Sequence, residues 1–190
     1  NDHEDGNGQF EMNWEYDDCL LTADRHVFFK FMAKSIAEKH GYRVTFMPKP
    51  FAHLTGNGCH AHVSVWDLAG KKNRFAHKTD ELGLSKLAYK FLGGVMHSAD
   101  ALAALYIPSV NSYKRIDADV TSSGATWSPN AITYSGDNRT HMIRSPPTTT
   151  DYQQTRSVMW RALSQCEPRH TRWHPQVYSH TVPCYRTLCM

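Results

Sequence analysis

The 190-residue chain has no long hydrophobic run, no strong excess of charge and no regular spacing of cysteines. Without an apolar stretch of about 20 residues or a signal-peptide pattern, we expect a cytoplasmic protein with no membrane partner. The formal net charge of +3 is too small to indicate a nucleic-acid partner. Hydrophobic residues make up 41% of the chain and charged residues 21%, which is typical of a single globular domain.

The five cysteines argue against two common small-protein architectures. Their number is odd, and no two of them have C-x-x-C spacing. A disulfide framework and a four-ligand zinc cage are therefore not expected.

The most informative stretch is residues 49–64, KPFAHLTGNGCHAHVS. Its loop contains Gly56 and Gly58, and glycine lets a backbone approach a ligand closely because it has no Cβ. The sequence then alternates as in a β-strand, which places every second side chain on one face. The residues predicted to share that face are His60, His62 and Ser64. Such a row suits a metal ion or a phosphate, although two histidines at this spacing are equally typical of a polar surface strand.

Near the amino end, Glu4 and Glu11 flank a turn that contains Gly6 and Gly8. Two carboxylates on either side of a tight turn can converge on one hard cation such as Mg²⁺ or Mn²⁺. Acidic turns are more commonly only solvated, so the composition leaves both interpretations open.

The clearest secondary structure is a scaffold helix that we expect to begin with Thr22 as its cap and to stop at Gly41. Its apolar residues at helical spacing are Val27, Phe28, Phe31, Met32 and Ile36. We also expect a strand over residues 43–47, a helix capped by Ser85 and a short helix over residues 98–105.

The segment from Lys49 resembles the ATP-binding signature of the glutamine synthetase family, a Lys-Pro pair followed by a Gly-x-Gly-x-His loop and a serine. The positions in register are Lys49, Pro50, Thr55, Gly56, Asn57, Gly58, His60 and Ser64. Gly8-Gln9-Phe10-Glu11 is similar to a metal-binding string of the same family, with Glu4 in the earlier ligand position. Within the family, the resemblance is closest to the bacterial type III-like glutamate–ammonia ligases. The resemblance implies an α+β fold, with an antiparallel curved sheet and flanking helices.

The resemblance also implies ATP-dependent amide formation through γ-glutamyl phosphate, with glutamate, ammonia and ATP as substrates and Mg²⁺ or Mn²⁺ as cofactor. By this resemblance Glu4 and Glu11 would hold one divalent ion, and His60 would hold a second. Gly56 and Arg115 would hold glutamate, since an arginine fork matches a carboxylate and keeps its charge.

The same resemblance implies a set of ATP-binding residues: His62, Ser64, Arg139 and Arg144. Arg139 and Arg115 are the predicted catalytic cations, because the negative charge that develops in phosphoryl transfer requires fixed positive groups.

The resemblance covers residues 1–145. Residues 146–190 lack the family's Arg-aromatic-Glu-x-Arg string, and we predict a divergent, poorly ordered tail that derives from an altered reading frame or an unrelated extension. By the same resemblance, we expect the family's N-terminal β-grasp domain to be absent as well. Full-length relatives form homo-oligomeric rings, which we do not expect of this fragment.

Three alternatives remain open from the sequence. The chain could be a catalytically inactive remnant that binds nucleotide and metal, or a γ-glutamyl–amine ligase. In a different class of protein, His60 and His62 with Asp67 or a distant carboxylate could form the mononuclear iron site of a β-barrel oxygenase.

Overall fold

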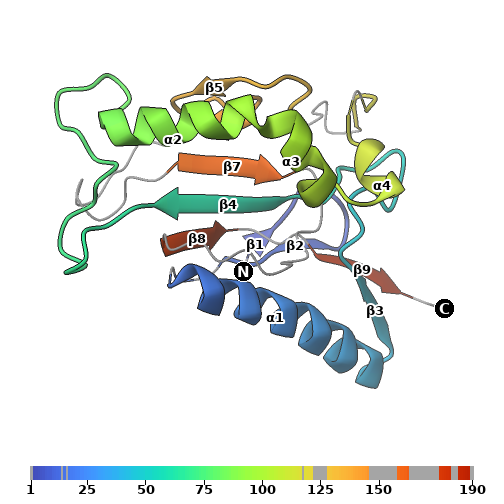
Figure 1. Cartoon of the computed structure of the whole chain (residues 1–190). Coiled ribbons are helices and arrows are strands. Elements are labelled where there is room, and N and C mark those ends of the chain that lie inside the picture. Colours follow the sequence, from blue (N-terminus) through green and yellow to red (C-terminus); the bar gives the residue numbers. More distant parts are fainter. Residues whose placement is uncertain are drawn as a thin grey trace.

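The computed structural model describes residues 2–13, 15, 17–116, 118–121, 128–145, 158–162, 176–180 and 184–188. The helices are α1 (Cys19–Lys39), α2 (Lys86–His97), α3 (Ala99–Tyr106) and α4 (Val110–Tyr113). The strands are β1 (Asp2–His3), β2 (Gln9–Glu11), β3 (Tyr42–Thr45), β4 (Cys59–Ser64), β5 (Tyr134–Ser135), β6 (Ile143–Arg144), β7 (Val158–Ala162), β8 (Gln176–His180) and β9 (Cys184–Leu188). Figure 1 shows how these elements are arranged.

The strands form two sheets, one with the order β1-β2-β9-β3 and one with the order β5-β6-β7-β4-β8. Among the described strands, all pairs are antiparallel except β5 with β6. The predicted α+β fold with largely antiparallel sheets is therefore observed, whereas the curvature of the sheet stays a prediction.

Strand β4, which carries the two histidines, is an interior strand of its sheet. His60 is in register with Arg161 of β7 on one side and with His180 of β8 on the other. In the second sheet, β9 pairs with both β2 and β3. The segment after residue 145 thus supplies β7, β8 and β9, while the rest of it lies outside the described residues. The predicted boundary at residue 145 and the poorly ordered tail stay predictions.

The hydrophobic core lies between α2 and the larger sheet, which contains β4 (Figure 1). Its buried members are Phe75, Leu84, Ala88, Leu92 and Ile143, and Val63 and Val65 pack against them. Helix α2 begins where the sequence predicts, because the Ser85 hydroxyl accepts a hydrogen bond from the amide N–H of Ala88 at 3.2 Å. Since Val63 faces this core, the alternation of a strand turns His60 and His62 to the opposite face.

Helix α1 begins earlier than the sequence predicts. Asp18 caps it by accepting the amide N–H of Leu20 at 2.9 Å, so the expectation of a Thr22 cap is wrong. A carboxylate is as good a cap as a hydroxyl, and Thr22 lies buried one turn into the helix. The expected stop at Gly41 is confirmed by its positive φ of 72°.

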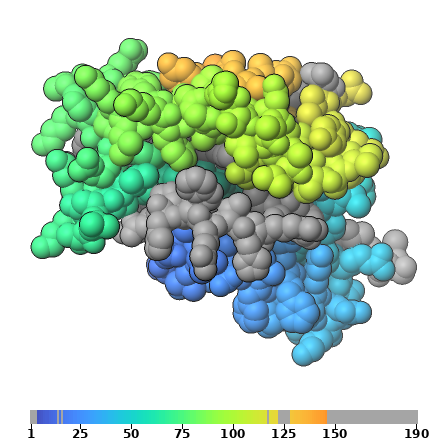
Figure 2. Space-filling view, viewed as in Figure 1, coloured from blue at the N-terminus to red at the C-terminus, as the bar shows by residue number. Residues whose placement is uncertain are grey.

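The apolar stripe of α1 is largely exposed. The exposed fractions are 49% for Val27, 62% for Phe28, 65% for Phe31 and 48% for Ile36. The helix instead packs through Phe29, whose ring lies edge-on to Phe46 with centroids 5.8 Å apart. Figure 2 shows α1, in blue, at one surface of the molecule. Among the described residues, no helix combines the length and the apolarity that crossing a bilayer requires.

Candidate active site

The structure brings the Glu4 and Glu11 side chains together at the amino end. Strands β1 and β2 pair antiparallel around the turn, in which Gly8 has a φ of 73°. Partial burial, together with the hydrogen bond and the negative charge of Glu11, raises the pKa of Glu4 to about 7. The two carboxyl groups therefore share a proton near neutral pH, because two adjacent carboxylates in a partly buried site do not both ionise readily.

A hard divalent cation fits this carboxylate pair. Oxygen ligands suit Mg²⁺ and Mn²⁺, and such an ion would take the place of the shared proton. The described residues contain no group of three or more His, Cys, Asp and Glu side chains arranged to hold a metal. His60 is accordingly not clustered with Glu4 and Glu11, and its assignment to a second ion stays a prediction.

Gly56, in the loop before β4, lies against the side chain of Arg115, which follows α4. A Cβ on Gly56 would lie 2.6 Å from the Pro48 carbonyl oxygen and 2.7 Å from Nε of Arg115, which is closer than real Cβ contacts. Nη1 of Arg115 donates a hydrogen bond to the Asn57 carbonyl oxygen. Arg115 is only 5% exposed, so the loop is closed around its guanidinium and only glycine fits at position 56.

Gln9 connects the carboxylate turn to this loop. Its Nε2 donates to Oδ1 of Asn57 at 3.0 Å and to the Gly56 carbonyl oxygen at 3.3 Å. Its Oε1 accepts the amide N–H of Gly6 at 3.0 Å. On the other side, Nδ2 of Asn57 donates to the Met47 carbonyl oxygen at 2.8 Å. The sequence motif includes Gln9 and Asn57, but nothing in their spacing reveals that they contact each other.

Lys49 and Asn111 fix the start of the loop. The Asn111 side chain accepts the amide N–H of Lys49 at 2.6 Å and donates to its carbonyl oxygen at 2.9 Å. Nζ of Lys49 donates to the Leu54 carbonyl oxygen at 2.5 Å. Burial and, secondarily, the charge of Arg115 lower the pKa of Lys49. Two buried cations that repel each other create a positive potential that favours an anion, such as a substrate carboxylate.

The row of side chains on β4, formed by His60, His62 and Ser64, is only partly available to a ligand. His60 and His62 are half-buried, whereas Ser64 is fully buried. The Ser64 hydroxyl accepts the indole N–H of Trp66 at 2.9 Å. Its predicted contact with ATP stays a prediction, and a nucleotide would have to approach beside this bond.

Arg139 and Arg144 lie close enough to affect each other electrostatically. Arg144 forms an ion pair with Asp137 at 2.9 Å, and its side chain is 13% exposed. Burial lowers the pKa of Arg144, the Asp137 charge opposes this shift, and the Arg139 charge adds to it. Arg139 itself is exposed. The pair offers positive charge to an anion, with Asp137 compensating part of it.

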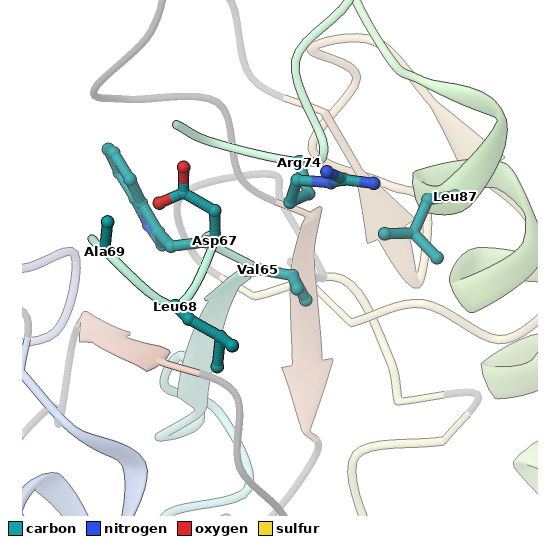
Figure 3. A pocket seen from close by; sticks show the side chains of 7 residues that line it. Val65, Asp67, Leu68, Ala69, Arg74 and Leu87 are labelled. Atoms are coloured by element: carbon teal, nitrogen blue, oxygen red, sulfur yellow. The ribbon is translucent and has the colours of Figure 1, made fainter. Parts of the chain in front are cut away.

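A shallow hollow of about 560 Å³ lies elsewhere, beside the end of β4 (Figure 3). Leu68 and Leu87 flank it, and of its lining residues only Asp67 was considered for a site, as the third ligand of the alternative iron centre. The Asp67 carboxylate accepts the amide N–H groups of Lys71 at 2.8 Å and Lys72 at 3.2 Å, which lowers its pKa. Asp67 therefore closes a turn, and the described residues give His60 and His62 no third metal ligand of this kind.

Comparisons with known proteins identify the class of protein. The chain is 69% identical over 146 residues to a glutamine synthetase of Rhizobium meliloti (strain 1021), covering 77% of this chain and 34% of that protein. It is 51% identical over 147 residues to a glutamate–methylamine ligase of Methyloversatilis universalis, covering 76% and 33%. The solved structure named "GmaS/ADP complex-Conformation 1" has 68% identity and a TM-score of 0.69, with 75% of this chain and 33% of that chain covered. The fold and the sequence thus define a ligase domain.

The chain belongs to the glutamine synthetase family, since the profile of the family "Glutamine synthetase, catalytic domain" matches residues 1–164. It spans about a third of the length of the curated relatives that it matches. Membership in a ligase family argues against the iron-oxygenase alternative, which required His60 and His62 to share a third ligand.

Proposed function

We propose that the chain is a catalytic-domain fragment of an ATP-dependent glutamate–ammonia ligase. The observation that supports this most is the linked arrangement of two converging carboxylates, a sterically closed glycine loop and a buried arginine. In the proposed reaction, a γ-carboxylate oxygen of glutamate attacks the γ-phosphorus of ATP and ADP leaves. Ammonia then attacks the γ-glutamyl phosphate, loses a proton and displaces phosphate.

In this proposal, the cationic side chains bind the anionic substrate groups and the carboxylates bind the metal ion. Arg115 and the backbone around Gly56 hold the glutamate carboxylate, as a buried guanidinium in a positive environment favours. Glu4 and Glu11 hold a divalent ion, which when bound neutralises phosphate charge. The proposed ATP-binding residues are His62, Ser64, Arg139 and Arg144. Fixing both reactants in one orientation and stabilising the charge that develops on the phosphoryl group are the two contributions such a site makes.

Ligand binding is the property of this fragment that can be measured directly. Since it spans about a third of its relatives, we expect it to bind Mn²⁺ and ADP but to show little or no turnover by itself. Glutamate-dependent ADP release from the purified chain measures turnover, and robust release would overturn this expectation. Mn²⁺ binding is measured by water proton relaxation. Glu4→Gln and Glu11→Gln should weaken it at least tenfold, and Glu81→Gln, which changes an exposed glutamate, should not.

A second candidate function is a glutamate–amine ligase, and the 51% identity to a glutamate–methylamine ligase favours keeping it. The two functions share the glutamate, ATP and metal sites and differ only in the acceptor. The chain can be fused to the parts of a relative that it does not span, and the turnover of this fusion with ammonia and with methylamine distinguishes the two functions.

We further propose a cytoplasmic location and, for this fragment, no ordered ring. The basis is the family's enzymatic role and the small share of the relatives' length that is present. Sedimentation of the purified chain tests the second point, because a discrete species of ring size would contradict it.

A further inference from the structure

We propose that Gln9 is a positioning residue that couples the Glu4–Glu11 carboxylate pair to the loop held by Arg115. It would make the binding of a divalent cation and the binding of glutamate depend on each other. This inference rests on the proposed function, since it assumes that those two sites bind these two ligands. It concerns a residue that has no ligand role of its own.

The side chain of Gln9 uses both ends of its amide for this link. It is 2% exposed, so its polar atoms are satisfied by protein rather than by water. The Oε1 atom accepts from Gly6 in the carboxylate turn, and Nε2 donates to Gly56 and Asn57 in the loop. A single planar group therefore bridges the carboxylate turn and the loop, whose residues Gly56 and Asn57 lie 47 and 48 positions after Gln9 in the sequence.

The backbone of Gln9 ties the same residue to the metal carboxylates. Its carbonyl oxygen accepts the amide N–H of Glu4 at 3.1 Å, and its amide N–H donates to the Gly6 carbonyl oxygen at 2.9 Å. Glu11 follows two residues later in the same strand, β2. A change in the separation of Glu4 and Glu11 when a cation binds between them would therefore shift the position of Gln9.

The loop cannot absorb such a shift by itself. Gly56 has no free space between the Pro48 carbonyl oxygen and Arg115. Asn57 is 4% exposed and is held by Met47 and Pro48 through hydrogen bonds of 2.8 and 2.7 Å. Its carbonyl oxygen accepts from Arg115. A displaced Gln9 amide thus moves the group on which the arginine rests, and densely packed segments transmit such displacements.

Only an amide of this length provides the link. Methionine has a similar length and no hydrogen-bonding amide, while an ionised glutamate has no donor for Gly56 and Asn57. Either change leaves buried polar groups without partners and removes the connection. The chain also offers a control: Asn73 is a buried amide, 1% exposed, that closes a turn by accepting the amide N–H of Phe75 at 2.9 Å and lies outside this network.

The experiment measures the Mn²⁺ affinity of the full chain with and without saturating glutamate, by water proton relaxation. The ratio of the two affinities is the coupling factor, which typical allosteric couplings place at about fivefold or more. We expect at least about fivefold coupling for the wild type and for Asn73→Ala. For Gln9→Met we expect a factor within about twofold of one, with the Mn²⁺ affinity in the absence of glutamate within about threefold of wild type.

Two further variants keep the result interpretable. Gln9→Glu, which preserves the shape of the side chain, replaces Gln9→Met if circular dichroism shows that the latter is unfolded. Adding Asn57→Ala to Gln9→Met should lower the coupling factor no further, because both changes break the same link. Additive losses would contradict the proposal.

The possible outcomes separate the two levels of inference. A wild-type chain that binds Mn²⁺ and glutamate without coupling, or a Gln9→Met chain with wild-type coupling, overturns the role of Gln9 and leaves the proposed function standing. A wild-type chain that binds neither ligand overturns the proposed function and this inference with it.

Discussion

The guanidinium of Arg115 lies so close to Gly56 that a methyl group there would be 2.7 Å from Nε and 2.9 Å from Cδ. Gly56→Ala should therefore displace the loop or Arg115 and lower the free energy of unfolding by about 1–3 kcal/mol, the usual range for overpacking. The measurement is urea unfolding followed by tryptophan fluorescence.

Gly93 provides the matched control for this change. It lies in α2, and a Cβ there would meet no atom within 4 Å. Gly93→Ala should raise the free energy of unfolding by about 0.5–1 kcal/mol, since alanine restricts the unfolded chain and favours helix. Equal effects of the two substitutions would contradict the closed geometry around Gly56.

The raised pKa of Glu4 predicts a pH-dependent stability in the absence of metal. Because the folded state holds this proton up to about pH 7, the stabilising contribution is complete below pH 4.5 and is lost as the pH rises through 7. Glu4→Gln imitates the protonated form and should flatten this decline. At pH 8 it should be more stable than wild type by on the order of 1 kcal/mol after solvent screening, or about 2–4 °C in Tm.

Metal provides the complementary measurement on the wild type. Mn²⁺ at pH 8 should restore stability to the wild-type chain and not to Glu4→Gln, with proton release that is largest near pH 6. A melting temperature that rises from pH 5 to pH 8 without metal would contradict the shared proton.

Arg144 allows a nucleotide role to be separated from the ion pair with Asp137. Arg144→Met should weaken ADP binding about tenfold, the value of one charge-assisted hydrogen bond. Asp137→Asn should leave ADP affinity unchanged or increase it, because it removes a competing anion. Asp137 is 59% exposed, so its loss should change stability by less than about 1 kcal/mol. Titration with a fluorescent ADP analogue measures both, and equal losses would assign Arg144 a purely structural role.

The exposed rings of α1 predict a surface effect on association. Phe28 and Phe31 are 62% and 65% exposed, so Phe28→Glu/Phe31→Glu should reduce dye binding and light scattering while changing stability by less than about 1 kcal/mol. Phe46→Ala is the contrasting change, because Phe46 is 2% exposed and its loss should cost about 3–5 kcal/mol. A large destabilisation by the double variant would show that these rings pack in solution.

Local sequence signals predicted local structure well. The alternation of β4, the Ser85 cap and the stop at Gly41 depend only on neighbouring residues, and the structure shows all three. The start of α1 was misplaced because Asp18 and Thr22 are both acceptable caps, and propensity does not choose between them.

Contacts between distant segments could not be predicted in this way. Gln9 with Asn57 and Lys49 with Asn111 are separated by 48 and 62 residues, and no periodicity relates them. The family motif placed Gly56 and Arg115 in one site, but the steric reason for the glycine, which is its contact with Pro48 and Arg115, arises only in the folded structure. Strands β7, β8 and β9 were missed because their segment has little alternation, so that pairing partners rather than pattern define them.

Strand β4 receives both of its neighbours, β7 and β8, from the carboxyl-terminal segment, and β9 of the same segment joins β2 to β3. During synthesis, the strand with the histidines emerges long before either neighbour is available, and closing such long loops is slow. Neither sheet can be completed until residues 176–188 have been translated, so the nascent chain exposes unpaired strand edges until then, and these edges can bind chaperones or start aggregation.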